Sequence, residues 1–329
     1  MNDKQAAILA LVLLSPLTAE LLSGSSPPLE FFFPLGFLFL VGLYGCGVLT
    51  VRELAVKWKK GWPSVLLLGA AYGVFLEGLV VRSFYDPTWQ DLGALGEYGR
   101  WAGVNWVWAI WLTLFHGIVS IAVPIILFNL MYPRLTRERL LSDIQLFIPG
   151  LIVVLLFVPG ILHFTYRPDG YVYALTLLVI LMFVFLAYGV PGDWPRMKSE
   201  GPILPPIHFF LLGFLFMVFA SVIVYGLPES DVPPTTVITL LALLCVGISL
   251  ALAYSAGRRY NERALFALVT GILTPFIILS FIHEANGMLG MSVVGVSYIV
   301  YLFLLMTKVW REAPEVTARK VPIDRTKSL

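Results

Sequence analysis

The residues of this chain that could do chemistry are a few carboxylates and imidazoles within long apolar runs. Glu77 lies in the same run as Gly69 and Gly73, and His116 lies in the next run along the chain. An ionisable side chain in an apolar run is costly, so it indicates a functional site or a buried pair. A carboxylate beside an imidazole can act as a general base or relay protons. We expect Glu77, His116 and His283 to be catalytic.

The same residue types also suggest a metal site. His116, His163, His283 and Glu77 offer imidazole and carboxylate ligands. Such ligands bind zinc or another divalent metal and leave one position open for water. A divalent metal is therefore a candidate cofactor. The alternative for each residue is an ion pair that holds two helices together.

Two further charged residues lie close to this set in the sequence. Glu20 follows Pro16, which should kink the first apolar run because proline lacks a backbone donor. Glu20 either faces the site or ends the helix at the headgroups. Arg82 follows the third run, where we expect it to pair with Asp86 or to bend back to Glu77.

Spacing predicts which helix faces meet. Gly69, Gly73 and Glu77 recur at every fourth position, so on a helix they share one face. Glycines on such a face allow close approach of another backbone. His116 and Ser120 also lie four residues apart, which puts a hydroxyl beside the imidazole.

Composition predicts a membrane protein. Hydrophobic residues make up 59% of the 329 residues and charged residues 13%, whereas soluble domains carry about 25% charged residues. We expect an all-α polytopic bundle of about ten spans, with a single transmembrane domain over residues 1–310 and a basic cytoplasmic tail over 311–329. The predicted spans are 6–23, 31–51, 64–81, 106–131, 144–164, 171–190, 207–225, 235–255, 264–283 and 291–310.

The basic residues predict the orientation of the bundle. With the N-terminus in the cytoplasm, the inside segments hold 19 of the 22 Lys and Arg residues, and only Arg82, Arg100 and Arg167 remain outside. This bias follows the positive-inside rule and puts both termini in the cytoplasm. We expect a prokaryotic plasma (inner) membrane. The first segment could alternatively be a cleaved signal peptide.

The first four spans carry a family resemblance. Ser15-Pro16, Gly61-Trp62-Pro63 and Leu76-Glu77-Gly78 resemble positions in a group of uncharacterised prokaryotic multi-pass membrane proteins. Members of that group have Glu-Glu-Gly where this chain has Leu76-Glu77-Gly78. The resemblance implies a multi-pass membrane fold and brings no known activity with it.

A second, weaker resemblance is to the intramembrane CAAX-protease and bacteriocin-processing family. That family has Glu-Glu-x-x-x-Arg on one helix, Phe-x-x-x-His on the next, and a later His-x-x-x-Asn or Asp. The matching residues are Glu77, Arg82, His116 and His283. The chain departs from the motifs at Gly78, Leu112 and Asn286, where it has a Gly for the second Glu, a Leu for the Phe, and an Asn one residue early.

These observations lead to three interpretations of function. The first is an intramembrane hydrolase or protease-like protein, with a Glu/His site in the outer half of the bundle and a hydrophobic peptide as partner. The second is a secondary transporter of a small solute or ion built as a five-plus-five inverted repeat. The third is a non-catalytic assembly or sensing subunit. All three predict a lipid bilayer as partner, and no basic stripe suggests nucleic acid.

Overall fold

The computed structural model of this protein is a bundle of long helices, described over residues 3–192, 204–255 and 261–312. Within those residues, ten helical segments are long and apolar enough to cross a membrane. This confirms the predicted all-α polytopic bundle. The spans are Asp3–Leu22, Pro34–Lys57, Trp62–Val80, Trp106–Met131, Asp143–His163, Gly170–Gly189, Pro206–Gly226, Pro234–Ala253, Glu262–Ala285 and Met291–Arg311.

Most spans are made of several consecutive helical elements. The first six spans and their connections contain α1 (Asp3–Pro16), η1 (Leu17–Leu22), α2 (Pro28–Phe31), α3 (Pro34–Leu40), η2 (Val41–Gly45), α4 (Cys46–Lys57), α5 (Trp62–Val74), η3 (Phe75–Val80), η4 (Gly93–Leu95), α6 (Trp106–Phe115), η5 (His116–Ala122), α7 (Val123–Met131), η6 (Pro133–Leu135), α8 (Asp143–Leu155), α9 (Phe157–His163) and α10 (Gly170–Gly189). The last four contain α11 (Pro206–Ser221), η7 (Val222–Gly226), η8 (Pro228–Ser230), α12 (Pro234–Ser255), α13 (Glu262–Ala285) and α14 (Met291–Glu312).

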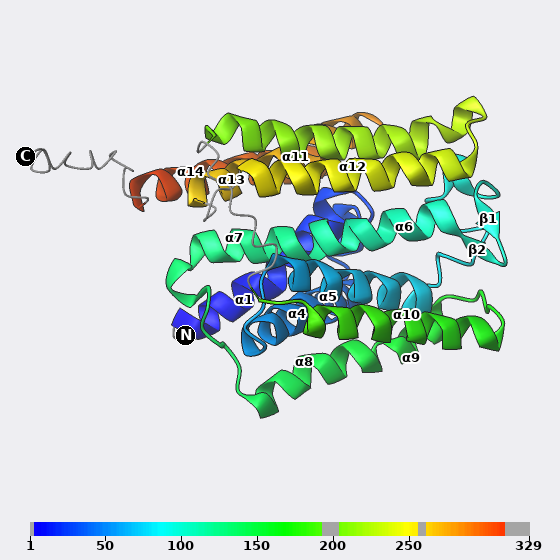
Figure 1. Ribbon diagram of the computed structural model, residues 1–329, viewed down its shortest axis with the longest axis horizontal. Coiled ribbons are helices and arrows are strands. Elements are labelled where there is room, and N and C mark those ends of the chain that lie inside the picture. The colour runs from blue at the N-terminus through cyan, green and yellow to red at the C-terminus, as the bar shows by residue number, and fades with distance from the viewer. Residues whose placement is uncertain (1–2, 193–203, 256–260, 313–329) are drawn as a thin grey trace, which may run out of the picture.

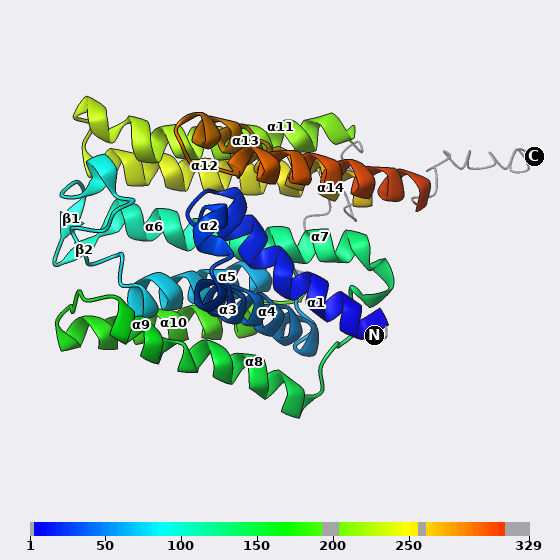
Figure 2. The ribbon, with the colours of Figure 1, turned by 180° about the vertical axis from the view of Figure 1, so that it is seen from behind.

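The helices form two groups that lie side by side (Figures 1 and 2). The first group runs from α1 to α10, and the second contains α11 to α14. α13 packs on α11 and α14 within its own group and on α7 of the first group. The groups thus contain six and four spans, a division that does not follow the halves of a five-plus-five repeat.

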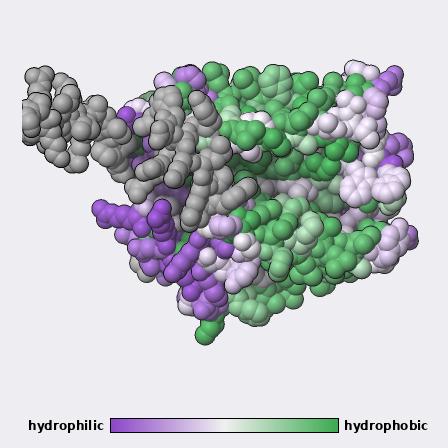
Figure 3. All heavy atoms as spheres, viewed as in Figure 1, coloured by the Kyte–Doolittle hydropathy of each residue, from purple (hydrophilic) through white to green (hydrophobic). Residues whose placement is uncertain are grey.

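The two ends of the bundle differ. A two-stranded antiparallel hairpin of β1 (Arg100–Trp101) and β2 (Val104–Asn105) marks one end, called here the hairpin end. The start of α1 and the end of α14 lie at the opposite end (Figures 1 and 2). In Figure 3 hydrophobic residues cover the flanks, while hydrophilic residues gather where α7 ends and α8 begins. Such a surface suits a lipid bilayer environment. The basic tail predicted over 311–329 falls outside the described residues from 313 onward.

Capping residues and prolines set several helix ends. The Asn105 side chain accepts a hydrogen bond from the backbone of Trp108 at the start of α6. Ser142 and Gln145 form a capping box that begins α8. α8 ends at Leu155 and α9 begins at Phe157 because Pro159 has no N–H to donate to the preceding turn.

Five of the described segments are π-helical. They are η1, η2, η3, η5 and η7. A π turn contains one more residue than an α turn, so it rotates the side chains that follow by roughly 100°. Four of the five lie in the first four spans, and single π turns are frequent at functional sites.

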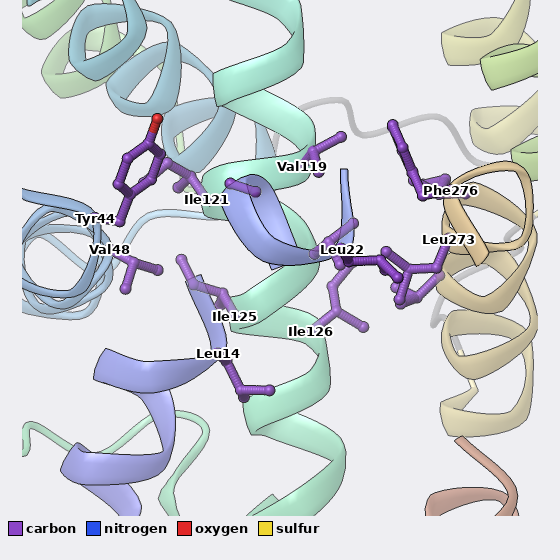
Figure 4. Packing of buried hydrophobic residues seen from close by; sticks show 14 of the residues in the cluster. Leu14, Leu22, Tyr44, Val48, Val119, Ile121, Ile125, Ile126, Leu273 and Phe276 are labelled. Carbon is purple, nitrogen blue, oxygen red and sulfur yellow. The ribbon is translucent and has the colours of Figure 1, made fainter. Parts of the chain in front are cut away.

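The third and fourth spans form the centre of the first group, and they are the most buried of the ten. A Cβ atom on Gly69 would lie 2.8 Å from the Cα of Gly117, and one on Gly73 would lie 2.9 Å from the Cβ of His116. The predicted glycine face is therefore confirmed as a close contact between two helices. Figure 4 shows how Leu22 and Leu273 gather beside the fourth span, where the two groups pack together.

This contact predicts the effect of adding one methyl group. In Gly69→Ala the new Cβ meets the backbone of Gly117, so we expect the free energy of unfolding to fall by about 1–3 kcal/mol. Gly150→Ala is the matched control, because nothing lies within 4 Å of a Cβ at that position. Thermal unfolding in detergent measures both. Equal effects of the two substitutions would contradict the assigned packing.

Candidate functional site

The candidate site is built on one pair of side chains from neighbouring spans. His116 Nε2 lies 2.9 Å from Glu77 Oε1. Glu77 is 7% exposed and His116 is 2% exposed, so protein encloses both. The sequence made both residues candidates for catalysis, and the structure brings them into direct hydrogen bonding.

Hydrogen bonds continue from both ends of this pair. Beyond Glu77, the Ser83 hydroxyl donates to Oε2, and the Trp108 indole N–H donates to Ser83 Oγ at 3.1 Å. Beyond the imidazole, His116 Nδ1 lies 2.9 Å from Ser120 Oγ. Five buried side chains thus form one connected polar chain from Trp108 to Ser120.

π turns position the main polar residues. Glu77 lies in η3, and His116 is the first residue of η5. Glu20 and Tyr44 lie in η1 and η2, the π turns of the first two spans. Because each π turn changes the direction of its side chains, four spans direct a polar residue toward the interior of the first group.

Aromatic rings surround the imidazole. The ring centroids of Phe115, Tyr44 and Tyr72 lie 5.5, 5.9 and 6.2 Å from that of His116. The pairs with Phe115 and Tyr72 are edge-to-face and the pair with Tyr44 is tilted, so aromatic side chains enclose the imidazole.

A second carboxylate lies beside this cluster. The Tyr44 hydroxyl donates to Glu20 Oε1, and the Ser26 hydroxyl donates to Oε2 at 2.7 Å. The sequence left open whether Glu20 faces the site or ends the helix at the headgroups. These contacts favour the first interpretation. Tyr44 touches both halves of the arrangement, since its hydroxyl binds Glu20 and its ring packs on His116.

The Glu77–His116 pair can take up a proton without losing a hydrogen bond. With Glu77 ionised and the imidazole neutral, Nε2–H donates to Glu77, and Nδ1 accepts from the Ser120 hydroxyl. When Nδ1 is protonated, Nδ1–H donates instead, and the Ser120 oxygen accepts. A hydroxyl both donates and accepts, so the same partners serve either state.

The other predicted ligands lie apart from this pair. His163 is exposed at the end of α9, where its ring contacts Phe164. His283 packs against the turn at Gly24. Among the described residues, no three His, Cys, Asp or Glu side chains are grouped so that they could hold a metal ion. The predicted ligand set of His116, His163, His283 and Glu77 is therefore not assembled, because His163 and His283 lie apart from the pair, near the ends of α9 and α13.

Arg82 takes a different role from the one that its spacing suggested. Its guanidinium donates to the carbonyl oxygens of Gly160, at 3.0 Å, and Phe164. These carbonyls take the place of the expected pairing with Asp86 or Glu77, and Arg82 itself has a left-handed backbone with φ of 69°. Desolvation lowers the pKa of this buried guanidinium.

Glu53 shows what a structural buried carboxylate looks like in the same protein. It pairs with Arg52 and accepts from the backbone N–H groups of Leu140 and Leu141 at 3.0 and 3.1 Å. Arg52 also donates to the carbonyl of Leu135. These bonds fix the loop before α8, and every partner is an arginine or backbone group. Glu77 and Glu20, by contrast, bind imidazole and hydroxyl groups, which exchange protons.

Sequence reasoning missed three members of the site. Tyr44, Ser83 and Trp108 were not assigned to it. Tyr44 lies beside glycines that only suggested packing, and Trp108 resembles one of many interfacial aromatics. Ser83 follows the third span directly after Arg82. A weak signal was available, since a serine so close to a buried carboxylate can fold back onto it.

Comparison with known proteins gives a family and no activity. The chain belongs to an uncharacterized membrane protein family, whose model matches residues 9–326. This confirms the resemblance to an uncharacterised membrane family and extends it over nearly the whole chain. No curated protein and no solved structure matches the chain.

The site predicts how substitutions of Glu77 affect stability. Glu77→Ala leaves the His116 Nε2 and the Ser83 hydroxyl without their partner, so we expect a loss of about 3–5 kcal/mol. Glu77→Gln keeps the shape and a hydrogen-bonding group, so its loss should be smaller. Unfolding in detergent compares both with Glu97→Ala, an exposed loop residue. A Glu77→Ala protein as stable as Glu97→Ala would contradict the buried pair.

Proposed function

We propose that this multi-pass membrane protein is a proton-coupled secondary transporter of a small solute or ion, with the Glu77–His116 pair as its proton-binding site. The observation that carries the proposal is the 2.9 Å contact between these side chains inside the bundle. Because the carboxylate and the imidazole are hydrogen-bonded to each other, a proton can move between them while each charged form keeps its partner. Intramembrane carboxylates and histidines are the usual proton relays of pumps and transporters.

Contacts between the two groups of helices support this proposal. The two groups of spans meet near the site through paired aromatics: Phe115 with Phe276, whose centroids are 6.0 Å apart, and Trp111 with Tyr225, joined by a 3.1 Å hydrogen bond. Phe115 also packs on His116. His116 is thereby linked through Phe115 to the interface between the two groups of helices. A change in its protonation can therefore act on that interface, where relative movement of the groups would open the bundle.

The basic residues support an orientation. The bias of 19 of the 22 basic residues toward one side favours the hairpin end as the outer one. We propose the plasma membrane of a prokaryote as the location of the protein. In this orientation, protons would reach Glu77 and His116 from the outside of the cell.

The transport function predicts solute-driven currents. Protein reconstituted on a solid-supported membrane is exposed to concentration jumps of amino acids, organic acids, organic cations, sugars and inorganic ions. We expect a transient current with one of these classes in the wild type and its loss in Glu77→Gln, because proton and solute movement are coupled. Glu97→Gln should keep the current. A current that survives Glu77→Gln, or silence toward all five classes, would contradict the proposal.

A second function is favoured by one observation. Ser120, His116 and Glu77 form a hydroxyl–imidazole–carboxylate chain with both contacts at 2.9 Å. Such a chain activates a serine nucleophile in hydrolases. Transport ranks first because Ser120 is fully buried, whereas a nucleophile must reach its substrate.

The hydrolase reading predicts covalent labelling of Ser120. A fluorophosphonate probe reacts with an activated serine, so a hydrolase would be labelled in the wild type and not in Ser120→Ala. From the burial of Ser120 we expect no labelling of either protein, with Ser230→Ala as a control for exposed hydroxyls. Labelling that disappears only in Ser120→Ala would reverse the ranking of the two functions.

A further inference from the structure

The buried position of the Glu77–His116 pair raises the question of how a proton reaches it. The branch through Ser83 ends at Trp108, whose indole N–H is a donor and accepts no proton. The branch through Ser120 ends at a hydroxyl that is 0% exposed. In the part of the chain that the structure describes, neither branch reaches an exposed side chain.

The remaining contact leads through Tyr44 toward Glu20. The Tyr44 ring lies 5.9 Å from the His116 ring, and its hydroxyl donates to Glu20. A phenol both donates and accepts, so it can take a proton on one side while it gives one on the other. Tyr72 lies at a similar 6.2 Å from His116, but its hydroxyl donates to the Leu43 carbonyl and to no carboxylate.

From Glu20, hydroxyl groups lead toward the surface. Ser26 donates to Glu20 Oε2 at 2.7 Å and is half-buried. Ser23 and Ser25 lie in the same turn with their hydroxyls 3.1 Å apart, and Ser25 is exposed. Unlike the two buried branches, this one therefore lies in a turn with an exposed side chain, that of Ser25.

The local sequence explains why Glu20 and Tyr44 face each other. Pro16 lacks the N–H that would bond the carbonyl of Val12 one turn earlier, and η1 begins directly after it. A Cβ on Gly45 would lie 2.5 Å from that Val12 carbonyl oxygen. Only glycine permits this approach, which brings the first two spans together beside Tyr44.

We infer that Glu20 is a second proton-binding carboxylate of this site, and that Tyr44 connects it to the Glu77–His116 pair. The inference rests on the proposed function and names the entry route of its proton. A proton on Glu20 Oε1 passes to the Tyr44 oxygen. The Tyr44 hydroxyl, which donates to Glu20 in the structure, turns toward the pair, and its own proton moves to a carboxylate oxygen of Glu77. Glu20 ends ionised, the pair ends protonated, and Tyr44 is neutral before and after.

Time-resolved infrared spectroscopy after a pH jump tests this route on the full-length protein in lipid nanodiscs. The carbonyl stretch of a protonated carboxylic acid is followed, with Glu20→Gln and Glu77→Gln used to assign the two bands. We expect Tyr44→Phe to keep both bands and to slow protonation of Glu77 by roughly 10²-fold, as for loss of an acid–base group. Glu20→Gln should slow it similarly. Tyr72→Phe, the matched control, should keep the wild-type rate.

The outcomes separate the route from the function. A wild-type rate of Glu77 protonation in both Tyr44→Phe and Glu20→Gln would overturn the route while leaving the proton-binding pair intact. Equal slowing in Tyr44→Phe and Tyr72→Phe would also overturn it, because a general packing defect would explain both. If Glu77→Gln removed no pH-dependent band, the proposed function itself would fail.

Discussion

The structure depends on the need of a carboxylate and an imidazole to satisfy each other away from water. Glu77 and His116 come from the two most buried spans, where an unpaired ionisable group would be strongly unfavourable. Their 2.9 Å contact removes that penalty only if α5 and the fourth span approach closely. Gly69 and Gly73 provide this approach, so packing and chemistry are fixed by the same helix face.

π turns convert this packed centre into a site with several polar members. One extra residue in a turn redirects the side chains that follow. Each of the first four spans has one polar residue of the site on such a turn. Glu20 and Tyr44 join the pair in this way. Glu53 does not, because arginine and backbone partners satisfy it at the other end of its span. Burial alone therefore does not mark a functional acid in this protein.

Much of the fold could be predicted from the sequence, because apolar length and basic loops determine membrane spans directly. The spacing of Gly69, Gly73 and Glu77 predicted a close helix contact on that face, but it did not identify His116 as the partner of Glu77. Tyr44 could not be predicted, since a π turn changes which residues of a helix face inward and leaves no clear sequence signal. Arg82 was misassigned because its partners are the backbone carbonyls of Gly160 and Phe164 at the end of α9, which no spacing in the sequence indicates. His163 and His283 resemble ligands by type, and only the arrangement of the helices separates them.

The measurement that tests the central claim most directly is ¹⁵N nuclear magnetic resonance of the histidine rings. The protein has four histidines, so His163→Gln, His208→Gln and His283→Gln together leave His116 alone. The account predicts that the His116 ring changes protonation with pH and that Glu77→Gln shifts this change, because the two groups share a proton. A His116 ring in one protonation state at every pH, unaffected by Glu77→Gln, would contradict it.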